Sequence, residues 1–279
     1  MTAIETRLEP ASSVGILVTP GADSDAWLSK ARAFQQQSAD PIVQISMSVD
    51  EALMMGVDDW LVVLTEAPNT RPEFRADQAR DLSRLFSQCA ERGGNCKVFG
   101  EGADVASVRI AEAALIRDSQ APIGPTHGPL QSLAVFRADA PATPIDVALL
   151  RMNDRRLVPG APLATFDLTG RPEVLVWGPH ITLPPGKWRL SIGFEVDRAA
   201  SAQSLAFEWG DLDGHERHEV SLGRAGRYDI VLDRDWDVAK IAELRVSAAH
   251  AVFAGCLRVI SVLIGRAPTE QPQAALNQL

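Results

Sequence analysis

The stretch KWRLSIGFEV, residues 187–196, decides the fold of the second half of this chain. Every second residue from Trp188 to Val196 is apolar, and the residues between them are charged or small. Side chains of a β-strand alternate between two faces, so this pattern predicts a strand with one buried face. The same alternation recurs at residues 205–209, 228–232 and 257–263. Beyond residue 145 we therefore expect eight or nine antiparallel strands in a β-sandwich, specifically a jelly roll.

Residues 14–121 follow a different pattern, in which short apolar runs alternate with longer segments of helical spacing. Such alternation is typical of strand-helix units on a parallel sheet. The longest expected helix covers residues 72–92, and a later one covers 104–117. This half of the chain is therefore predicted to be a small parallel α/β domain of Rossmann-like type.

A cluster of five prolines separates the two halves, between residues 122 and 144. Proline is incompatible with a helix interior, and the period changes from 3.6 to 2 across this stretch. We therefore expect an α/β domain at 14–121, a proline-rich connection at 122–144 and a sandwich domain at 145–266. The ends, 1–13 and 267–279, are expected to be flexible.

Composition excludes several classes of protein. The chain has 279 residues and a formal net charge of -9, with no clustered basic stripe, so a nucleic-acid partner is not expected. No apolar run reaches the roughly 18 residues of a membrane helix, and the N-terminus carries acids where a signal peptide is basic and apolar. The three cysteines fit no metal or disulfide pattern. We expect a cytoplasmic protein with free thiols that does not span a membrane.

The motif VWGPHITLPPGKWRL, residues 176–190, and the later AELRV, residues 242–246, resemble those of carbohydrate-binding-like β-sandwich modules. Such modules accompany bacterial glycosyltransferases and polysaccharide-assembly proteins. The resemblance covers about residues 145–266, and His180 stands where the pattern has an aromatic residue. It implies a saccharide ligand and partners among the other proteins of a polysaccharide-assembly system.

Three residues are the candidates for a ligand site on the sandwich. Trp177 stands beside a Gly-Pro pair and Trp236 lies in the acidic stretch DRDWD, where burial is harder than at Trp188 or Trp209. An indole face can stack on a sugar ring, and loops carry function. His180 follows Trp177 within the same motif. No metal site is expected, because the GDLDGHE loop at 210–216 lacks the ligand spacing of a calcium loop and is better explained as a hairpin turn.

The α/β domain offers a second place for a site, beyond the carboxyl ends of its parallel strands. Asp23, Glu66 and Glu101 would lie there. The stretch FGEGADV, residues 99–105, begins like a dinucleotide fingerprint, but it has Val105 at the third small position and an acid that would repel a pyrophosphate. No nucleotide or other cofactor is therefore expected.

Three functions remain open. The favoured one is a non-catalytic accessory or regulatory protein of bacterial surface or exopolysaccharide assembly, with a carbohydrate-binding-like sandwich. The second is a transferase or hydrolase that uses Asp23, Glu66 or Glu101 at the edge of the α/β sheet. The third is a protein-protein scaffold with no small ligand. A deep polar pocket at that edge would favour the enzyme, and an aromatic sandwich surface would favour recognition.

Overall fold

The structure of the protein is a computed structural model, which describes residues 13–21, 23–37, 42–65, 72–94, 96–99, 128–136 and 142–268. The chain divides into two compact units, Met1–His127 and Gly128–Leu279. The division falls inside the proline-rich stretch 122–144. The helix expected at 104–117 lies outside the described residues.

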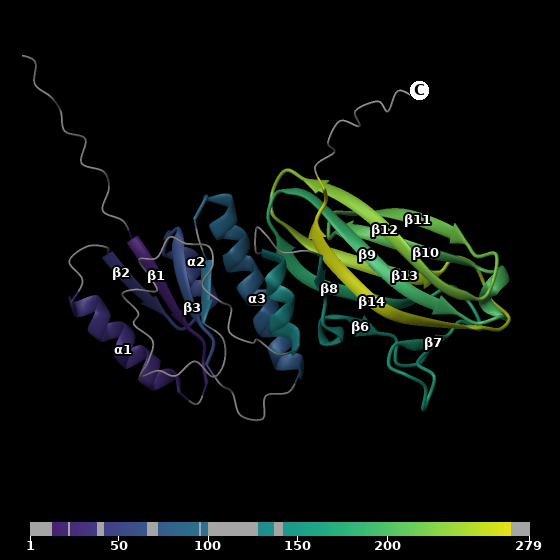
Figure 1. The fold of residues 1–279 in the computed structure, drawn as a ribbon, viewed down its shortest axis with the longest axis horizontal. Helices are drawn as coiled ribbons and strands as arrows, with labels where there is room; N and C mark the ends of the chain where they lie inside the picture. Colours follow the sequence, from purple (N-terminus) through teal and green to yellow (C-terminus); the bar gives the residue numbers. More distant parts are fainter. Residues whose placement is uncertain are drawn as a thin grey trace, which may run out of the picture. The chain divides into compact units, whose positions relative to one another are not determined.

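The first unit is built on a four-stranded parallel sheet in the order β2-β1-β3-β4 (Figure 1). Its elements in chain order are β1 Ser13–Val18, α1 Ser24–Gln37, β2 Ile42–Ser46, α2 Val49–Met54, β3 Asp59–Val63, α3 Pro72–Glu91 and β4 Cys96–Phe99. The prediction of a small parallel α/β unit is confirmed.

Helices cover both faces of this sheet. Ile16 and Val18 of β1 pack against Trp27 and Leu28 of α1, and all four side chains are buried. Leu17 points to the opposite face, toward α2 and α3. Because neighbouring residues of a strand face opposite ways, a run of consecutive apolar residues is what a sheet covered on both faces requires.

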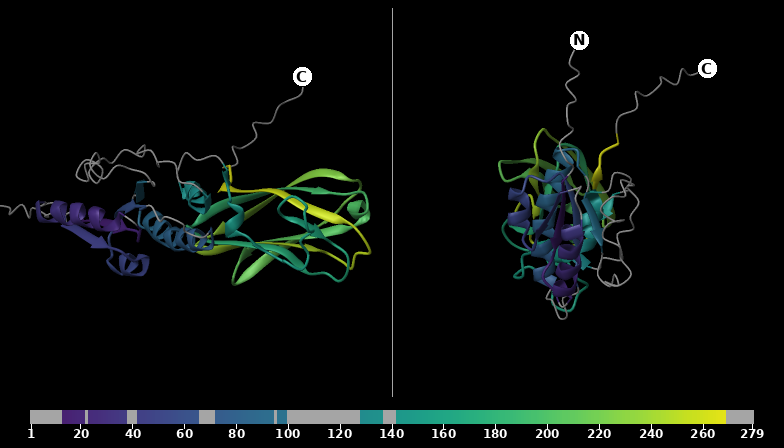
Figure 2. Two further views of the ribbon diagram at one scale, coloured as in Figure 1. Left: turned by 90° about the horizontal axis from the view of Figure 1, so that it is seen from below. Right: turned by 90° about the vertical axis from the view of Figure 1, so that its left-hand side faces the viewer.

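The second unit is a sandwich of two mainly antiparallel sheets, which Figure 2 shows as separate layers. One sheet has the order β11-β10-β13-β8-β6, and the other has the order β12-β9-β14-β5, with β7 also paired to β14. The strands are β5 Thr143–Pro144, β6 Arg151–Met152, β7 Thr165–Asp167, β8 Val174–Leu183, β9 Gly186–Val196, β10 Ser204–Asp211, β11 Gly214–Ser221, β12 Gly226–Trp236, β13 Lys240–Ala248 and β14 Cys256–Arg266.

The core of the sandwich lies between the two sheets. Trp188 and the alternate residues after it on β9 are each at most 2 % exposed, which confirms the strand predicted from KWRLSIGFEV. Phe194 of β9 meets Phe207 of β10 in the other sheet, with 5.1 Å between the ring centroids. The inner faces of the two sheets therefore interdigitate.

Three short 3-10 helices complete the second unit: η1 Gly128–Phe136, η2 Val147–Leu149 and η3 Ala200–Ala202. The first of them, η1, lies within the proline-rich stretch and buries Leu130 and Leu133. The Ser132 hydroxyl accepts from the Asp146 N–H at 2.9 Å. Part of the proline-rich stretch therefore belongs to the sandwich unit.

Candidate functional site

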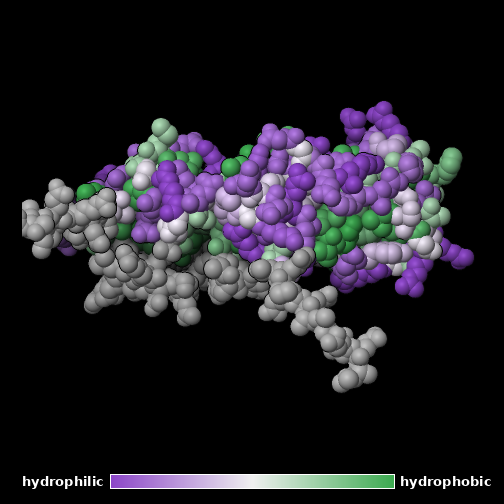
Figure 3. Space-filling view, turned by 90° about the horizontal axis from the view of Figure 1, so that it is seen from above, coloured by the Kyte–Doolittle hydropathy of each residue, from purple (hydrophilic) through white to green (hydrophobic). Residues whose placement is uncertain are grey.

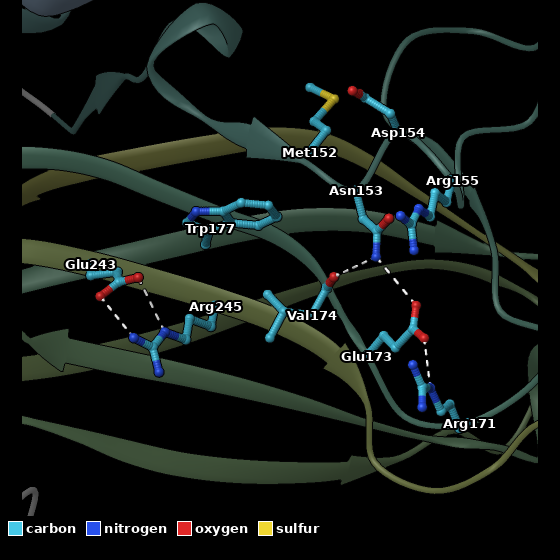
Figure 4. A pocket seen from close by; sticks show the side chains of 10 residues that line it. All are labelled: Met152, Asn153, Asp154, Arg155, Arg171, Glu173, Val174, Trp177, Glu243 and Arg245. Carbon is cyan, nitrogen blue, oxygen red and sulfur yellow. Dashed lines mark hydrogen bonds and ion pairs between the residues drawn. The ribbon is translucent and has the colours of Figure 1, made fainter.

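A hollow of about 720 Å³ lies on the outer face of the β11-β10-β13-β8-β6 sheet (Figure 4). We call it the sheet-face hollow. It is lined by Met152, Asn153, Asp154, Arg155, Arg171, Glu173, Val174, Trp177, Glu243 and Arg245. These residues come from strand β6 and the turn after it, the segment that leads into β8, β8 itself and β13. Chain segments nearly a hundred residues apart therefore build one surface.

Strand register aligns polar and aromatic side chains in one row across this sheet. Trp177 of β8 lies opposite Arg245 of β13 on one side and opposite Arg151 of β6 on the other. Arg245 is opposite Glu208, which is in turn opposite Arg217. Side chains directly opposite each other in antiparallel strands share a face. The row therefore presents one indole between two guanidinium groups.

Trp177 is only partly buried, whereas Val176, its neighbour on the inner face of the sheet, is fully buried in the core. Gly178 has a φ of 131°, and a Cβ there would lie 2.7 Å from the carbonyl oxygen of Leu149. Only glycine fits both the dihedral angle and the space. The backbone of β8 can thus lie against the end of η2 while the indole of Trp177 faces outward into the hollow.

Glu243 is the buried anchor of the site, with 3 % of the residue exposed. The Nε and Nη2 of Arg245 each donate a 3.1 Å hydrogen bond to its carboxylate. His180 Nε2 lies 3.5 Å from Oε1, and His215 Nε2 lies 3.2 Å from Oε2. Burial alone would raise the pKa of Glu243, but the hydrogen bonds from Arg245 and the charges of Arg245 and the two imidazoles outweigh it and lower the pKa.

A second ion-pair cluster fixes the other side of the hollow. Glu173 accepts from Arg171 Nε at 2.9 Å and from Arg156 Nε at 3.1 Å. These two hydrogen bonds lower the pKa of Glu173 to about 2. Asn153 Nδ2 donates to the Val174 carbonyl at 3.2 Å and to Glu173 at 3.4 Å. The polar side chains are therefore held in place before any ligand arrives.

The expectation that Trp236 is an exposed loop residue is wrong. Trp236 ends strand β12 and is 4 % exposed. Its Nε1 donates to Asp211 at 2.9 Å, and its ring meets Trp209 edge to face with 5.5 Å between the centroids. Neither face of this indole is open to a ligand. The Asp211 carboxylate accepts this hydrogen bond and so gives the indole N–H a partner, which allows the side chain to be buried.

Of the sandwich candidates, Trp177 lines the sheet-face hollow and His180 lies 3.5 Å from Glu243, and the sequence did not single out the polar residues beside them. Glu243 and Arg245 occurred only within the AELRV resemblance. Their alternation with Ala242 and Leu244 was the available signal, because it places both charged side chains on one face of a strand.

The carboxyl edge of the α/β sheet holds a smaller hollow of about 260 Å³. It is lined in part by Thr19 of the β1 end, Asp50, Asp77 and Asp81. Burial raises the pKa of Asp81. The charge of Arg84 opposes this shift, and the neighbouring carboxylates add to it. Three acids disfavour a phosphate group here.

Of the three residues of the enzyme alternative, Asp23 alone lies in the part of the chain that the structure describes. Asp23 is not among the lining residues of the smaller hollow, and its Oδ2 accepts from the indole Nε1 of Trp27 at 2.9 Å. Glu66 and Glu101 lie outside the described residues.

Exposed apolar side chains also occur on the sandwich. Figure 3 shows an apolar strip with hydrophilic margins on one face of the second unit. On the loop between β13 and β14, Phe253 is 95 % exposed. Such side chains would serve the scaffold alternative.

Two kinds of feature are absent from the described part of the chain. No group of three His, Cys, Asp or Glu residues there is arranged to hold a metal ion. No helix among the same residues has both the length and the apolar character to cross a bilayer.

No family model and no curated protein matches the chain. Among solved structures, TmCBM61 in complex with beta-1,4-galactotriose is 12 % identical, with 42 % of this chain and 87 % of that chain covered and a TM-score of 0.31. A family 16 carbohydrate-binding module is 8 % identical, with 46 % and 86 % covered and a TM-score of 0.27.

A third solved structure matches over most of this chain. The Glycosylation Associate Protein (Gap123) complex from Streptococcus agalactiae is 10 % identical, with 91 % of this chain and 50 % of that chain covered and a TM-score of 0.28. Carbohydrate-binding modules and a glycosylation-associated protein are thus among the structures that this chain is similar to.

Proposed function

We propose that the sandwich unit binds a saccharide in the sheet-face hollow and that the protein is a non-catalytic accessory factor of bacterial polysaccharide assembly in the cytoplasm. The observation that carries this proposal is the half-exposed indole of Trp177 among polar side chains held by ion pairs. An indole face matches the apolar face of a pyranose ring, and the surrounding amide and guanidinium groups match its hydroxyls.

The polar groups of the hollow are preorganised, which favours binding. Arg245 is held by both oxygens of Glu243, and Asn153 is held by Glu173 and the Val174 carbonyl. Side chains that are already fixed lose little conformational entropy when a ligand binds. A site on a sheet face still buries less of its ligand than a closed cleft does, so we expect weak binding.

The electrostatics of the hollow support binding rather than hydrolysis. Glycoside hydrolysis needs a carboxylic acid whose pKa is raised enough to hold a proton near neutral pH. Glu173 and Glu243 have lowered pKa values because arginines donate hydrogen bonds to both. Both are therefore ionised at neutral pH, and neither supplies the general acid.

The topology of both units bears on the finer fold predictions. From β8 to β10 and from β11 to β14 the chain crosses between the sheets at each step, with one hairpin at β10–β11, as in a jelly roll. The order β2-β1-β3-β4 is that of the first four strands of a flavodoxin-like sheet, which is doubly wound as the Rossmann sheet is but has a different strand order.

Calorimetric titration of the full chain with a panel of neutral and acidic oligosaccharides tests the proposal. We expect at least one to bind, and Trp177→Ala to weaken that binding roughly tenfold, or about 1.4 kcal/mol. Phe253→Ala, which removes an exposed aromatic outside the hollow, is the matched control and should bind as the wild type does. Absence of binding to every oligosaccharide, or equal affinity of the Trp177→Ala variant, would contradict the proposal.

A turnover assay distinguishes the proposed non-catalytic function from the alternative of a transferase or hydrolase. Nucleotide sugars, phosphate esters and oligosaccharides should remain intact when incubated with the protein. Turnover that is lost in Asp23→Asn would instead support a site at the edge of the α/β sheet.

A further inference from the structure

We infer that the saccharide bound in the sheet-face hollow is acidic, with a carboxylate on its sugar ring as in a uronic acid. This inference rests on the proposed function and specifies its ligand. It is carried by an excess of arginine around Trp177 and by two of these arginines that have no protein partner among the described residues.

The charge around the hollow is opposite in sign to that of the whole chain. The formal net charge of the protein is -9. The lining of the hollow is neutral in sum, with Arg155, Arg171 and Arg245 against Asp154, Glu173 and Glu243. Two further arginines beside the lining, Arg151 opposite Trp177 and Arg156 bound to Glu173, make the local sum positive. The next pair along the row, Arg217 and Glu208, is neutral in sum. An anionic ligand is therefore attracted to this surface and not to the chain in general.

The carboxylates of Glu173 and Glu243 already accept hydrogen bonds from other arginines. Both oxygens of Glu173 accept from arginines, one from Arg171 and one from Arg156. Both oxygens of Glu243 accept from Arg245. Neither carboxylate has an oxygen left to neutralise a further guanidinium, and only the exposed Asp154 remains to offset the other arginines.

Arg151 and Arg155 are the two arginines left over. Both are exposed, and within the described residues neither makes an ion pair or a side-chain hydrogen bond. Arg155 lines the hollow, close to Asn153 in Figure 4. Arg151 is directly opposite Trp177 in the β6–β8 pair. Opposite residues in such a pair have Cβ atoms about 5 Å apart, so the Arg151 guanidinium can reach the rim of a ring stacked on the indole.

The chemistry of these groups selects a carboxylate on the ring. The carboxylate of a uronic acid projects from the rim of the pyranose, while the ring face remains free to stack on an indole. Guanidinium is planar and donates two parallel hydrogen bonds to a carboxylate, which a neutral hydroxymethyl group cannot accept in the same way. A ligand carboxylate would thus supply the partner that the protein does not give to Arg151 and Arg155.

The test compares each acidic oligosaccharide with its own neutral counterpart, in which the carboxyl groups have been reduced to primary alcohols. Oligomers of galacturonate, glucuronate, mannuronate and guluronate cover the common ring configurations. We expect at least one acidic oligomer to bind at least tenfold more tightly than its reduced form in low salt. That difference should shrink as sodium chloride is added, since exposed charges are screened.

Substitutions of single arginines test which residues cause the preference for the acidic oligomer. Arg151→Gln or Arg155→Gln should weaken binding of the acidic oligomer far more than binding of its reduced form, so that most of the preference is lost, and Arg155→Lys should retain part of it. Arg227→Gln makes the same charge change on an exposed arginine of β12 in the other sheet and should have no effect. Circular dichroism and thermal melting confirm that each variant is folded.

The outcomes distinguish this inference from the function on which it rests. If reduced and acidic oligomers bind equally and Trp177→Ala abolishes both, the saccharide function stands and the acidic ligand is wrong. If acidic oligomers bind better but the preference survives both arginine variants, the inference is also wrong. If no oligosaccharide of either kind binds, both proposals fail.

Discussion

The indole Nε1 of Trp236 donates a 2.9 Å hydrogen bond to the Oδ2 of Asp211, and this bond links the end of β12 to the end of β10. The other oxygen of Asp211 accepts from the backbone N–H groups of Asp213 at 2.8 Å and Gly214 at 3.2 Å. Asp211 is 5 % exposed. One buried carboxylate therefore organises the β10–β11 turn and satisfies the tryptophan that covers it.

Trp236→Phe should destabilise the protein by about 1–3 kcal/mol, because it puts a smaller aromatic ring in place of the indole and leaves a buried carboxylate oxygen without its donor. Urea unfolding of wild type and variant measures the difference. Trp177→Phe is the matched control, since within the described residues the Trp177 indole donates no hydrogen bond. It should change stability by less than about 0.5 kcal/mol. Equal effects of the two substitutions would show that the Asp211 bond contributes nothing.

Trp188→Ala should cost about 3–5 kcal/mol, as expected for removal of a large buried aromatic side chain. Trp188 is 1 % exposed, and its Nε1 donates to the Pro184 carbonyl at 2.8 Å. The Arg266 guanidinium lies 4.0 Å from its ring centroid. Thermal and urea unfolding check the value, with Trp177→Ala on the outer face as the mild comparison. An unchanged midpoint for Trp188→Ala would mean that the inward register of β9 is wrong.

We expect the folded protein to lose stability in acid as Glu173 becomes protonated. Its pKa drops from an ordinary value of 4.5 to about 2 in the folded chain because of the hydrogen bonds from Arg171 and Arg156. A group with a lowered pKa stabilises the folded state above its unfolded pKa, and that stability is lost as the pH falls from 4.5 toward 2. Glu173→Gln should therefore destabilise the protein at pH 6 and have a smaller effect at pH 3.

Urea unfolding at a series of pH values checks this dependence. Asp154→Asn is the control, because it alters another carboxyl group of the same hollow. Among the described residues Asp154 makes no ion pair, so the stability of this variant should depend on pH as that of the wild type does. A constant destabilisation of Glu173→Gln from pH 6 to pH 3 would contradict the prediction.

Cys96 should react slowly with alkylating reagents in the folded protein. Burial, followed by a hydrogen bond with Cys89, raises the pKa of the Cys96 thiol well above its ordinary value, and the two Sγ atoms lie 2.8 Å apart. The thiolate is the reactive form, so its population is small. In a Cys256→Ser background, iodoacetamide labelling of Cys96 at pH 8 should be at least tenfold slower than in urea, by mass spectrometry of the digested chain. Equal rates would refute the buried thiol pair.

Strands whose pattern repeats without interruption could be predicted from sequence, and interrupted ones could not. Strand β9 alternates over its whole length, and the prediction of its buried face is confirmed. Strand β8 changes the parity of its inward residues, because Val176 and Ile181 both face the core although five positions separate them. The one extra residue at the His180 bulge, between Pro179 and Ile181, causes this change, and a period of two cannot reveal it.

The candidate site was predictable only where its signal is local. Trp177 stands beside Gly178 and Pro179, and that neighbourhood marked it as hard to bury. The DRDWD stretch around Trp236 carried the same local signal, but Asp211, twenty-five positions earlier, provides the partner that permits burial. Arg245 and Glu243 join Trp177 through strand register, which depends on the pairing of distant segments.

The bulge at His180 has a consequence for how strand β8 tolerates a change in length. Pro179 pairs with Glu243 and Ile181 pairs with Ala242, while His180 stands outside the ladder with a φ of 61°. Deleting that single residue would join two segments that are already in register, so Trp177 would stay outward and Ile181 inward. A sandwich with this strand pairing can therefore gain or lose one residue at this position while Trp177 keeps its face of the sheet.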